Sequence, residues 1–318
     1  MRIALVTPAG AGSRAGNRHT ALRWAAFLRA AGHRVVVATQ WQPEERTDLL
    51  LALHARRSHA SIRDFSRAHP GKPVVLALTG TDVYRDIRTS DEARESLELA
   101  TRFIVLQPKA IEELAQRLRP RASVVVQSCA TRLQHARVKR TSRFCVIGHL
   151  REEKDPLRAL EALRLIPDAA IELVQIGESL ETRFADAARA AMQDEPRYRW
   201  LGSLPHGRAL RWLASSHAMV ISSRMEGGAN VVSEAIRIGV PVIASRIPGN
   251  LGLLGDEYPA YFAAQNTRAL AALLRRTFSD AAFYGELRKR VTRLRPMVDP
   301  KREARMLLGA VRAAASSA

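Results

Sequence analysis

Residues 222–242 read SSRMEGGANVVSEAIRIGVPV and contain the strongest structural signal in the sequence. The apolar run Ala218–Ser222 predicts a buried strand, the pair Gly227-Gly228 predicts a turn, and the apolar spacing that follows predicts a helix. The residues GVPV at positions 239–242 begin another buried strand. This segment therefore predicts a strand–turn–helix–strand unit of a parallel sheet.

The glutamates of this segment, Glu226 and Glu234, are separated by seven residues. Glu226 precedes the glycine pair and Glu234 lies inside the predicted helix, so the two carboxylates can contact opposite ends of one ligand. Helix N-termini attract anions, because their first N–H groups have no partner within the helix. We therefore predict that Glu226 contacts the reacting end of a nucleotide-sugar and that Glu234 contacts its ribose. The phosphates between them would face the amides of Gly227, Gly228, Ala229, Asn230 and Val231.

Short apolar runs alternate with amphipathic helical stretches, six runs between Arg2 and Gln127 and five between Arg143 and Ala244. Strands that are buried on both faces read as continuous apolar runs. The pattern predicts the α/β class, with two Rossmann-like doubly wound parallel-sheet domains that face a cleft. We expect an acceptor domain over residues 1–135 and a nucleotide-sugar domain over residues 136–299. A last helix at about 300–318 is expected to pack back on the first domain.

The loop after the first strand, residues 7–19, holds three glycines and admits three interpretations. Dinucleotide binding needs a GxGxxG spacing, but the spacing here is one residue longer, and Gln40-Trp41 stand where an acid is expected. The second interpretation is a plain tight turn. The third is a substrate loop, in which a small anion binds to Gly12, Arg14, Asn17, Arg18 and His19.

Polar residues also follow two other predicted strands. Thr79, Thr81 and Asp82 follow the fourth strand, where they can contact a sugar or a phosphate. Asp82 can also cap the next helix, and the two roles are compatible. Arg151 and Lys154 follow the seventh strand, in a loop that leads to a helix. They can clamp a diphosphate, although a solvated charge cluster is the simpler interpretation of these two residues alone.

The net charge of +19, from 50 basic and 31 acidic residues, first suggests a polyanionic partner. Arginine makes up 44 of the 50 basic residues, and their dispersed positions indicate a bias of composition. No aromatic RNA-binding motif or zinc-finger spacing accompanies the charge, so we expect no nucleic-acid partner. We also expect no membrane span and a cytoplasmic location, because the sequence has no run of 18 apolar residues, no signal or transit peptide, and no disulfide framework.

These motifs resemble those of the retaining glycosyltransferases of family four, which have the GT-B fold. That family carries two glutamates separated by seven residues, matched here by Glu226 and Glu234. It continues with a Gly-x-Pro-Val strand, matched by Gly239–Val242, and its early Ala-Gly-His-x-Val segment matches Ala31–Val35. The resemblance covers essentially the whole chain and implies transfer of a sugar from a nucleotide-sugar.

The diphosphate loop of the family, Gly-Arg-Leu-x-x-x-Lys, matches Gly148, Leu150 and Lys154, with His149 in place of the arginine. The resemblance implies that a second cation beside Lys154 is supplied by Arg151 or by His149. The implied catalytic residues are Glu226, Arg151 and Lys154, and the implied donor-binding residues are Glu234, the segment 227–231 and His149. No Asp-x-Asp motif is present, so we expect no catalytic metal and no cofactor, with the nucleotide-sugar as a substrate.

Four segments narrow the resemblance to one subgroup, the selenosugar synthases of selenoneine biosynthesis: residues 16–24, 78–86, 148–156 and 248–255. The resemblance implies a C–Se bond formed between selenophosphate and a UDP-sugar, for which we expect UDP-N-acetylglucosamine. The predicted acceptor and phosphate contacts are Gly12, Arg14, Asn17, Arg18, His19, Thr79, Thr81 and Asp82. A family-four transferase with a hydroxyl acceptor at an anionic membrane and a UDP-sugar 2-epimerase stay open as alternatives, as does the oligomeric state.

Overall fold

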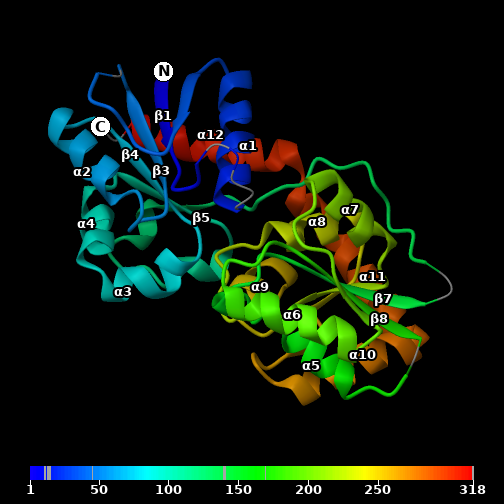
Figure 1. The fold of residues 1–318 in the computed structure, drawn as a ribbon. Coiled ribbons are helices and arrows are strands. Elements are labelled where there is room, and N and C mark those ends of the chain that lie inside the picture. Colours follow the sequence, from blue (N-terminus) through cyan, green and yellow to red (C-terminus); the bar gives the residue numbers. More distant parts are fainter. Residues whose placement is uncertain (11, 13–15, 45, 139–140, 169, 317–318) are drawn as a thin grey trace. The chain divides into compact units, whose positions relative to one another are not determined.

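The structure is a computed structural model of the chain (Figure 1), and it describes every residue except 11, 13–15, 45, 139–140, 169 and 317–318. Contacts between residues divide the chain into two compact units. Unit 1 comprises Met1–Gln127, Glu226–Ala229 and Pro300–Ala318. Unit 2 comprises Ser128–Met225 and Asn230–Asp299. Each unit is built around one parallel sheet.

The first division between the units falls after Gln127, whereas the sequence suggested a boundary after residue 135. Backbone hydrogen bonds account for the difference. The N–H of Cys129 donates to the carbonyl of Val298, and the N–H of His135 donates to the carbonyl of Ile238. The segment between the two sheets therefore packs along unit 2 before β7 begins.

The sheet of unit 1 has the order β2-β1-β3-β4-β5-β6, and all of its strand pairs are parallel. Its central strands are continuous apolar runs that are buried on both faces, as in LLLAL and VVLAL. The strands are β1 (Arg2–Val6), β2 (Arg34–Ala38), β3 (Leu49–Leu53), β4 (Val74–Leu78), β5 (Arg102–Val105) and β6 (Ala122–Val124). The helices are α1 (Gly16–Ala30), α2 (His59–Ala68), α3 (Ile87–Thr89), α4 (Asp91–Leu99) and α12 (Pro300–Ala315).

The last helix, α12, packs in unit 1 beside α1 (Figure 1). Its apolar side, with Leu307 and Val311, joins the same buried cluster as Trp24 of α1. Glu303 is 1% exposed and accepts hydrogen bonds from Trp24 Nε1 at 2.7 Å and Arg23 Nε at 2.8 Å. A buried carboxylate needs such partners, and these contacts hold the end of the chain on the sheet of unit 1.

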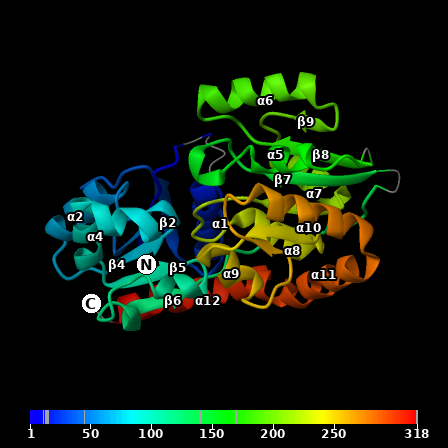
Figure 2. The ribbon, with the colours of Figure 1, turned by 90° about the horizontal axis from the view of Figure 1, so that it is seen from below.

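The sheet of unit 2 has the order β12-β11-β10-β7-β8-β9, again all parallel, and Figure 2 shows β9, β8 and β7 side by side. The strands are β7 (Ser142–Ile147), β8 (Ile171–Ile176), β9 (Tyr198–Trp200), β10 (Ala218–Ile221), β11 (Val242–Ser245) and β12 (Tyr261–Phe262). The two-residue strand β12 was not predicted, because two residues carry no periodic signal.

Helices cover both faces of this second sheet: α5 packs against α10, whereas α8 packs against α7 and α11. The helices of unit 2 are α5 (Arg158–Arg164), α6 (Thr182–Asp194), α7 (His206–Ser215), α8 (Asn230–Ile238), α9 (Pro248–Leu254), α10 (Thr267–Ser279) and α11 (Ala281–Leu294). The predicted α/β class with two doubly wound parallel sheets is thus confirmed. Within the described residues, no helix has the length and apolar character needed to cross a membrane.

Candidate active site

In unit 1, the loop Thr79–Asp82 follows β4 and is held by the carboxylate of Asp82. This carboxylate is fully buried and accepts hydrogen bonds from the backbone N–H of Gly80 at 2.7 Å, Thr79 at 2.9 Å and Ala55 at 3.1 Å. These donors precede Asp82 in the chain, so the side chain does not form the predicted helix cap. The side chain is fully buried, and its predicted contact with a ligand stays a prediction. Asp82 positions the loop.

The segment Glu226–Ala229 packs against this loop within unit 1. A Cβ atom on Gly227 would lie 2.3 Å from the carbonyl oxygen of Thr79, and one on Gly228 would lie 2.6 Å from Cβ of Leu106. The glycine pair is therefore required for the close approach of the two backbones. Glu226 itself is 8% exposed. The predicted catalytic carboxylate and the predicted acceptor loop thus belong to the same unit.

The first turn of α1 lies beside the same loop. Asn17 Nδ2 donates a hydrogen bond to Thr79 Oγ1 at 3.4 Å, which joins the two segments that we predicted to bind the acceptor. Arg18 is partly buried, and its Nε atom is buried without a hydrogen-bond partner among the described residues. A buried guanidinium N–H without an acceptor costs free energy, so this position favours an anion.

The other residues predicted for this loop are placed less closely. Gly12 has a φ of 83° and open space around it, as expected of a glycine that makes a turn. The side chain of His19 is exposed at the start of α1. Arg14, which we predicted to bind the acceptor, lies outside the described residues.

His54, which the sequence did not predict, contacts the candidate acceptor loop. It follows β3 with a φ of 78°, is 2% exposed, and places its Nε2 atom 3.0 Å from Thr81 Oγ1. The backbone N–H of Arg57 donates to Nδ1 at 3.3 Å, so Nδ1 is the acceptor nitrogen and Nε2 carries the proton. Burial lowers the pKa of His54, which keeps the ring neutral. Since Thr81 Oγ1 accepts from His54, the Thr81 hydroxyl can donate its own proton to a ligand.

Two carboxylate–arginine contacts surround His54. Asp86 Oδ2 lies 3.8 Å from His54 Nε2 and accepts from Arg56 Nε at 2.9 Å, while Asp86 Oδ1 accepts from Arg85 Nε at 3.1 Å. Burial raises the pKa of Asp86, but the hydrogen bonds from the two arginines outweigh burial and leave this pKa below its usual value. The position of His54 directly after a strand was the signal that could have identified it.

In unit 2, the loop after β7 begins with a close contact between two strand ends. A Cβ atom on Gly177 would lie 1.9 Å from the carbonyl oxygen of Gly148, so only glycine fits after β8. The next residue, His149, is partly buried, and its Nδ1 atom is buried without a hydrogen-bond partner among the described residues. The predicted alternative, that His149 takes part in binding the diphosphate, stays a prediction.

The basic residues of this loop lie among acidic ones. Arg151 Nε is 3.9 Å from Glu153 Oε2, and the stem of Lys154 passes 4.0 Å from the position that a Cβ on Gly148 would take. The loop is tied to the end of β10, because Ser222 Oγ donates to the carbonyl of Lys154 at 3.2 Å. Lys154 thus lies beside the end of β7, and its predicted contact with a diphosphate stays a prediction.

Glu234 lies inside α8, and its carboxylate is paired. His206 Nε2 lies 2.8 Å from Glu234 Oε1, and the side chain of Glu234 is 15% exposed. His206 is the first residue of α7 and was not predicted as a site residue. The residues whose amides we predicted to face phosphates are divided between the units: Gly227, Gly228 and Ala229 belong to unit 1, and Asn230 and Val231 begin α8 in unit 2.

The described part of the chain contains no group of three or more histidine, cysteine, aspartate or glutamate residues that could hold a metal ion. The expectation that the enzyme uses no metal and no cofactor stays a prediction. Cys129 and Cys145 are both buried and form no disulfide, and burial raises the pKa of Cys145 to about 12. Neither cysteine is placed for nucleophilic chemistry.

The two sheets, the helices on their faces and the polar strand-end loops define the fold of GT-B glycosyltransferases. Solved structures of this fold match the whole chain. HepE from Anabaena, in complex with UDP and glucose, has a TM-score of 0.75 at 14% identity, and the match covers 100% of both chains. Sucrose-phosphate synthase from Thermosynechococcus elongatus has a TM-score of 0.78 at 16% identity, again over 100% of both chains.

The family follows from the sequence itself. Residues 130–293, just over half of the chain, match the model of the glycosyl transferases group 1, and the chain belongs to this family. A curated relative, glycosyltransferase 1 domain-containing protein 1 of Xenopus tropicalis, is 26% identical over 272 residues. That match covers 76% of this chain and 78% of the relative.

Proposed function

We propose that this glycosyltransferase uses UDP-N-acetylglucosamine as donor and selenophosphate as acceptor. The observation that carries the choice of a small anionic acceptor is the set of donors in unit 1. Arg18 Nε is buried without an acceptor among the described residues, and the neighbouring Asn17 is hydrogen-bonded to Thr79. Thr81, held by His54, has a hydroxyl proton to donate. Such donors suit an oxyanion better than a neutral hydroxyl.

The choice of UDP as the nucleotide of the sugar donor is supported by a solved structure that is similar to this chain. HepE from Anabaena has been solved with UDP-glucose, at a TM-score of 0.78 and 14% identity over 98% of this chain and 100% of that chain. In our proposal Glu234 contacts the ribose, and Lys154 with Arg151 or His149 contacts the diphosphate. Glu226 contacts the sugar at its reacting end, and the amides of residues 227–231 face the phosphates.

The proposed reaction forms a bond between selenium and C1 of the sugar while the bond from C1 to the UDP oxygen breaks. The electron pair of that bond leaves with UDP, and Lys154 stabilises the charge that develops on the diphosphate. Ionised selenium is already a strong nucleophile, so the site needs no general base. Water then cleaves the Se–P bond, which yields the 1-selenosugar and phosphate. The main contributions of the protein are positioning and electrostatic stabilisation.

The test is to incubate the protein with UDP-N-acetylglucosamine and selenophosphate and to search for a selenium-containing sugar by mass spectrometry. We expect UDP release that depends on selenophosphate and a product with the isotope pattern of selenium. UDP release at an equal rate without selenophosphate, or with sugar and lipid hydroxyl acceptors instead, would refute the acceptor. An altered sugar still bound to UDP would identify an epimerase.

Arg18→Ala distinguishes the acceptor from the donor in the same assay. Loss of one charge-assisted hydrogen bond should raise the KM of selenophosphate about tenfold and leave the KM of the donor unchanged. Arg29→Ala is not a suitable control, because Arg29 Nη2 bonds to the carbonyl of Val35. Arg67→Ala on α2, at an exposed position in the same unit, provides the matched loss of charge.

A further inference from the structure

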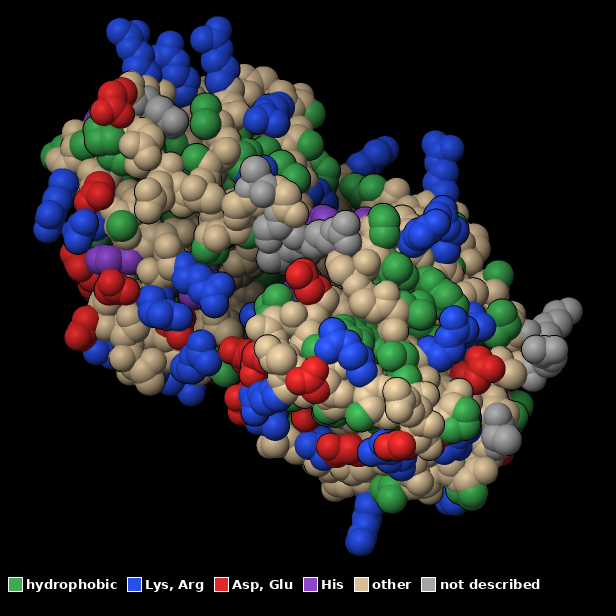
Figure 3. Space-filling model, in the orientation of Figure 1, with side chains coloured by type: hydrophobic (Ala, Val, Ile, Leu, Met, Phe, Trp, Pro, Cys, Tyr) green, Lys and Arg blue, Asp and Glu red, His purple; other side chains and the backbone are tan. Residues whose placement is uncertain are grey.

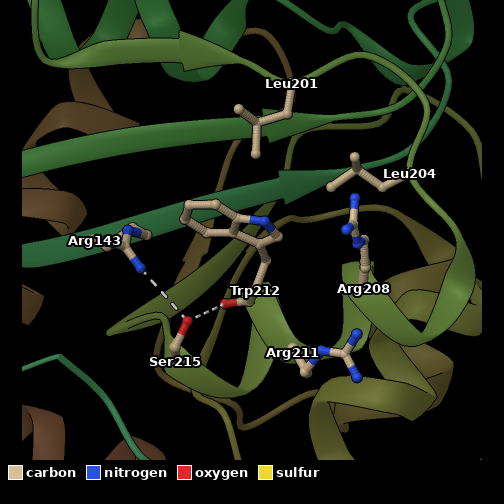
Figure 4. Close-up of a pocket in the computed structure, with 7 residues that line it drawn as sticks. All are labelled: Arg143, Leu201, Leu204, Arg208, Arg211, Trp212 and Ser215. Carbon is tan, nitrogen blue, oxygen red and sulfur yellow. Dashed lines mark hydrogen bonds between the residues drawn. The ribbon is translucent and has the colours of Figure 1, made fainter.

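Unit 2 contains a cavity of about 510 Å³ beside helix α7, and none of its lining residues was predicted to bind donor or acceptor (Figure 4). The cavity lies between α7, the start of β7 and the loop that follows β9. Arg208, Arg211, Trp212 and Ser215 come from α7, and Arg143 comes from β7. The volume lies within the range of sites for small organic molecules, and the cavity is wide open to solvent.

The charge of the cavity is strongly positive. Arg143, Arg208 and Arg211 all line it, and Arg208 and Arg211 are exposed without an ion pair to any residue that the structure describes. Arg143 Nε lies 3.7 Å from Glu172 Oε2, too far for a hydrogen bond, and it is buried without a hydrogen-bond partner in the described chain. Only the carboxylate of Glu172 lies near these three guanidinium groups among the described ion pairs. A bound anion would neutralise part of the remaining positive charge.

The remaining wall is apolar. Leu201 and Leu204 lie above the ring of Trp212 in Figure 4, and these three side chains belong to a small cluster with the buried Val174 and Ile176. Figure 3 shows hydrophobic and basic side chains next to each other on the face of unit 2 that is turned to the viewer. A partly exposed tryptophan and two leucines leave apolar surface for a ligand to cover.

Two arginines also lie near the indole ring of Trp212. The guanidinium of Arg143 lies 4.7 Å from the ring centroid of Trp212, and that of Arg199 lies 6.0 Å from it. A cation over an aromatic face is attracted by the electron-rich ring. A ligand with an anionic group and a flat apolar body would meet the guanidiniums and the ring together.

We propose that this cavity binds a small amphipathic anion, with a sulfonate, phosphate or carboxylate group on an aromatic body. The anionic group pairs with Arg208, Arg211 and Arg143, and the aromatic body packs on Trp212 and the two leucines. The site is independent of the proposed reaction, since it uses no residue of the predicted donor or acceptor sites. It is a second ligand site on the sheet of unit 2.

The experiment is a fluorescence titration with 8-anilinonaphthalene-1-sulfonate, an aromatic sulfonate whose emission rises in apolar surroundings. The pocket variant is the double change Arg208→Ser and Arg211→Ser. The matched control is Arg268→Ser with Arg275→Ser, which removes two exposed arginines from α10 of the same unit. We expect the pocket variant to bind the probe about tenfold more weakly and the control to bind it as the original chain does. Because all four arginines are exposed, we expect both variants to fold as the original chain does. Urea unfolding verifies this.

Two further probes test the amphipathic character of the ligand. Trp212→Ala should also weaken binding of the aromatic sulfonate, and inorganic phosphate should compete with it only at far higher concentration, because phosphate has no apolar body. Equal binding by the pocket and control variants would overturn the proposal. So would competition by phosphate at the concentration of the probe. Flotation with vesicles of phosphatidylcholine and phosphatidylglycerol, lost in the pocket variant while probe binding is kept, would identify a membrane surface instead.

Discussion

The polar loops at the strand ends of the two units are held in different ways. In unit 1, the loop Thr79–Asp82 is fixed by hydrogen bonds to the backbone, with the Asp82 carboxylate accepting from three amides. In unit 2, the residues around Lys154 form ion pairs between side chains, such as Arg224 Nη1 with Glu152 Oε1 at 3.3 Å. Buried backbone contacts make a rigid loop, whereas exposed ion pairs exchange partners at little cost. The first loop is therefore preorganised. In the second loop Ser222 holds the backbone at Lys154, and it is the charged side chains that can rearrange around a ligand.

The largest effect is expected from a loss of charge in the loop of unit 2. Lys154→Ala should lower kcat about 100- to 1,000-fold, or about 3–4 kcal/mol in the barrier, because it removes a cation from the departing diphosphate. Urea unfolding should change little. The control is Lys289→Ala, at an exposed position of α11 in the same unit. A kcat of Lys154→Ala within twofold of the original would show that the loop does not contact the diphosphate.

In unit 1, replacing the charged residue of the Thr79–Asp82 loop should lower the stability of the fold. Asp82→Ala leaves the amides of Thr79, Gly80 and Ala55 without their acceptor, so we expect the free energy of unfolding to fall by about 3 kcal/mol. Urea denaturation measures it. Asp64→Ala, which breaks only the exposed pair with Arg63, should cost less than about 0.5 kcal/mol. Similar losses in both variants would contradict the structural role of Asp82.

Buried histidines occur in both units. For His217 of unit 2, the effect of burial can be measured as a pH dependence of stability. Burial lowers the pKa of His217 to about 4, and its ring stacks on Tyr284 with centroids 4.1 Å apart. In the unfolded chain the His217 ring is protonated below about pH 6.5, whereas in the native state it is protonated only below about pH 4. Protonation of His217 therefore favours unfolding. Stability should fall by about 3 kcal/mol from this group as the pH falls from 6.5 to 4.

Urea unfolding at pH 7 and pH 4.5 tests this, with His217→Gln as the comparison. The variant should be less stable at pH 7, because it loses the contacts of the ring, but its stability should depend less on pH. An equal pH dependence in both chains would mean that another group is responsible. His54 of unit 1, whose pKa is also lowered by burial, adds to the same trend.

A smaller effect is expected for the nucleotide. Glu234→Gln should weaken UDP binding about tenfold, or about 1.4 kcal/mol, because a neutral amide replaces the charged acceptor proposed for the ribose. Calorimetric titration with UDP measures the change. Glu257→Gln, at an exposed position of unit 2, is the control. Unchanged UDP affinity in Glu234→Gln would contradict the proposed contact with the ribose. The only remaining role of the carboxylate would be its contact with His206.

The smallest effect is expected for the preorganised hydroxyl of unit 1. Thr81→Val should raise the KM of the acceptor about fivefold, or about 1 kcal/mol, and leave that of the donor unchanged. Thr81→Ser keeps the hydroxyl and should restore the original value. His54→Asn should resemble Thr81→Val in KM, because it removes the group that orients the hydroxyl. If only the KM of the donor changed, Thr81 would contact the donor and not the acceptor.

Much of the fold could be predicted because buried parallel strands are continuous apolar runs. LLLAL and VVLAL of unit 1 and VIAS of unit 2, which is β11, carry that signal without help from other parts of the chain. The candidate site was predicted in part, since residues after strands collect at one edge of a parallel sheet. Thr79 and Asn17, 62 positions apart, indeed form a hydrogen bond.

Other features depended on contacts between distant residues. The sequence could not distinguish the buried Asp82, which braces a loop, from an exposed ligand contact, because both follow a strand in the same way. His54 and His206 were missed because their partners, Thr81 and Glu234, lie 27 and 28 positions away in the chain. Such pairings follow from the packing of whole elements and leave no local pattern.

By itself, the sequence determined the two parallel sheets and the family, because apolar runs and strand-end motifs are local properties of the chain. Only the tertiary structure placed Glu226–Ala229 in unit 1, through the close approach of Gly227 to Thr79, and anchored α12 there through Glu303. It alone brought Arg143 of β7 over the ring of Trp212 on α7, 4.7 Å from its centroid. Burial decides each of these features, and the burial of a side chain depends on what the rest of the chain packs against it.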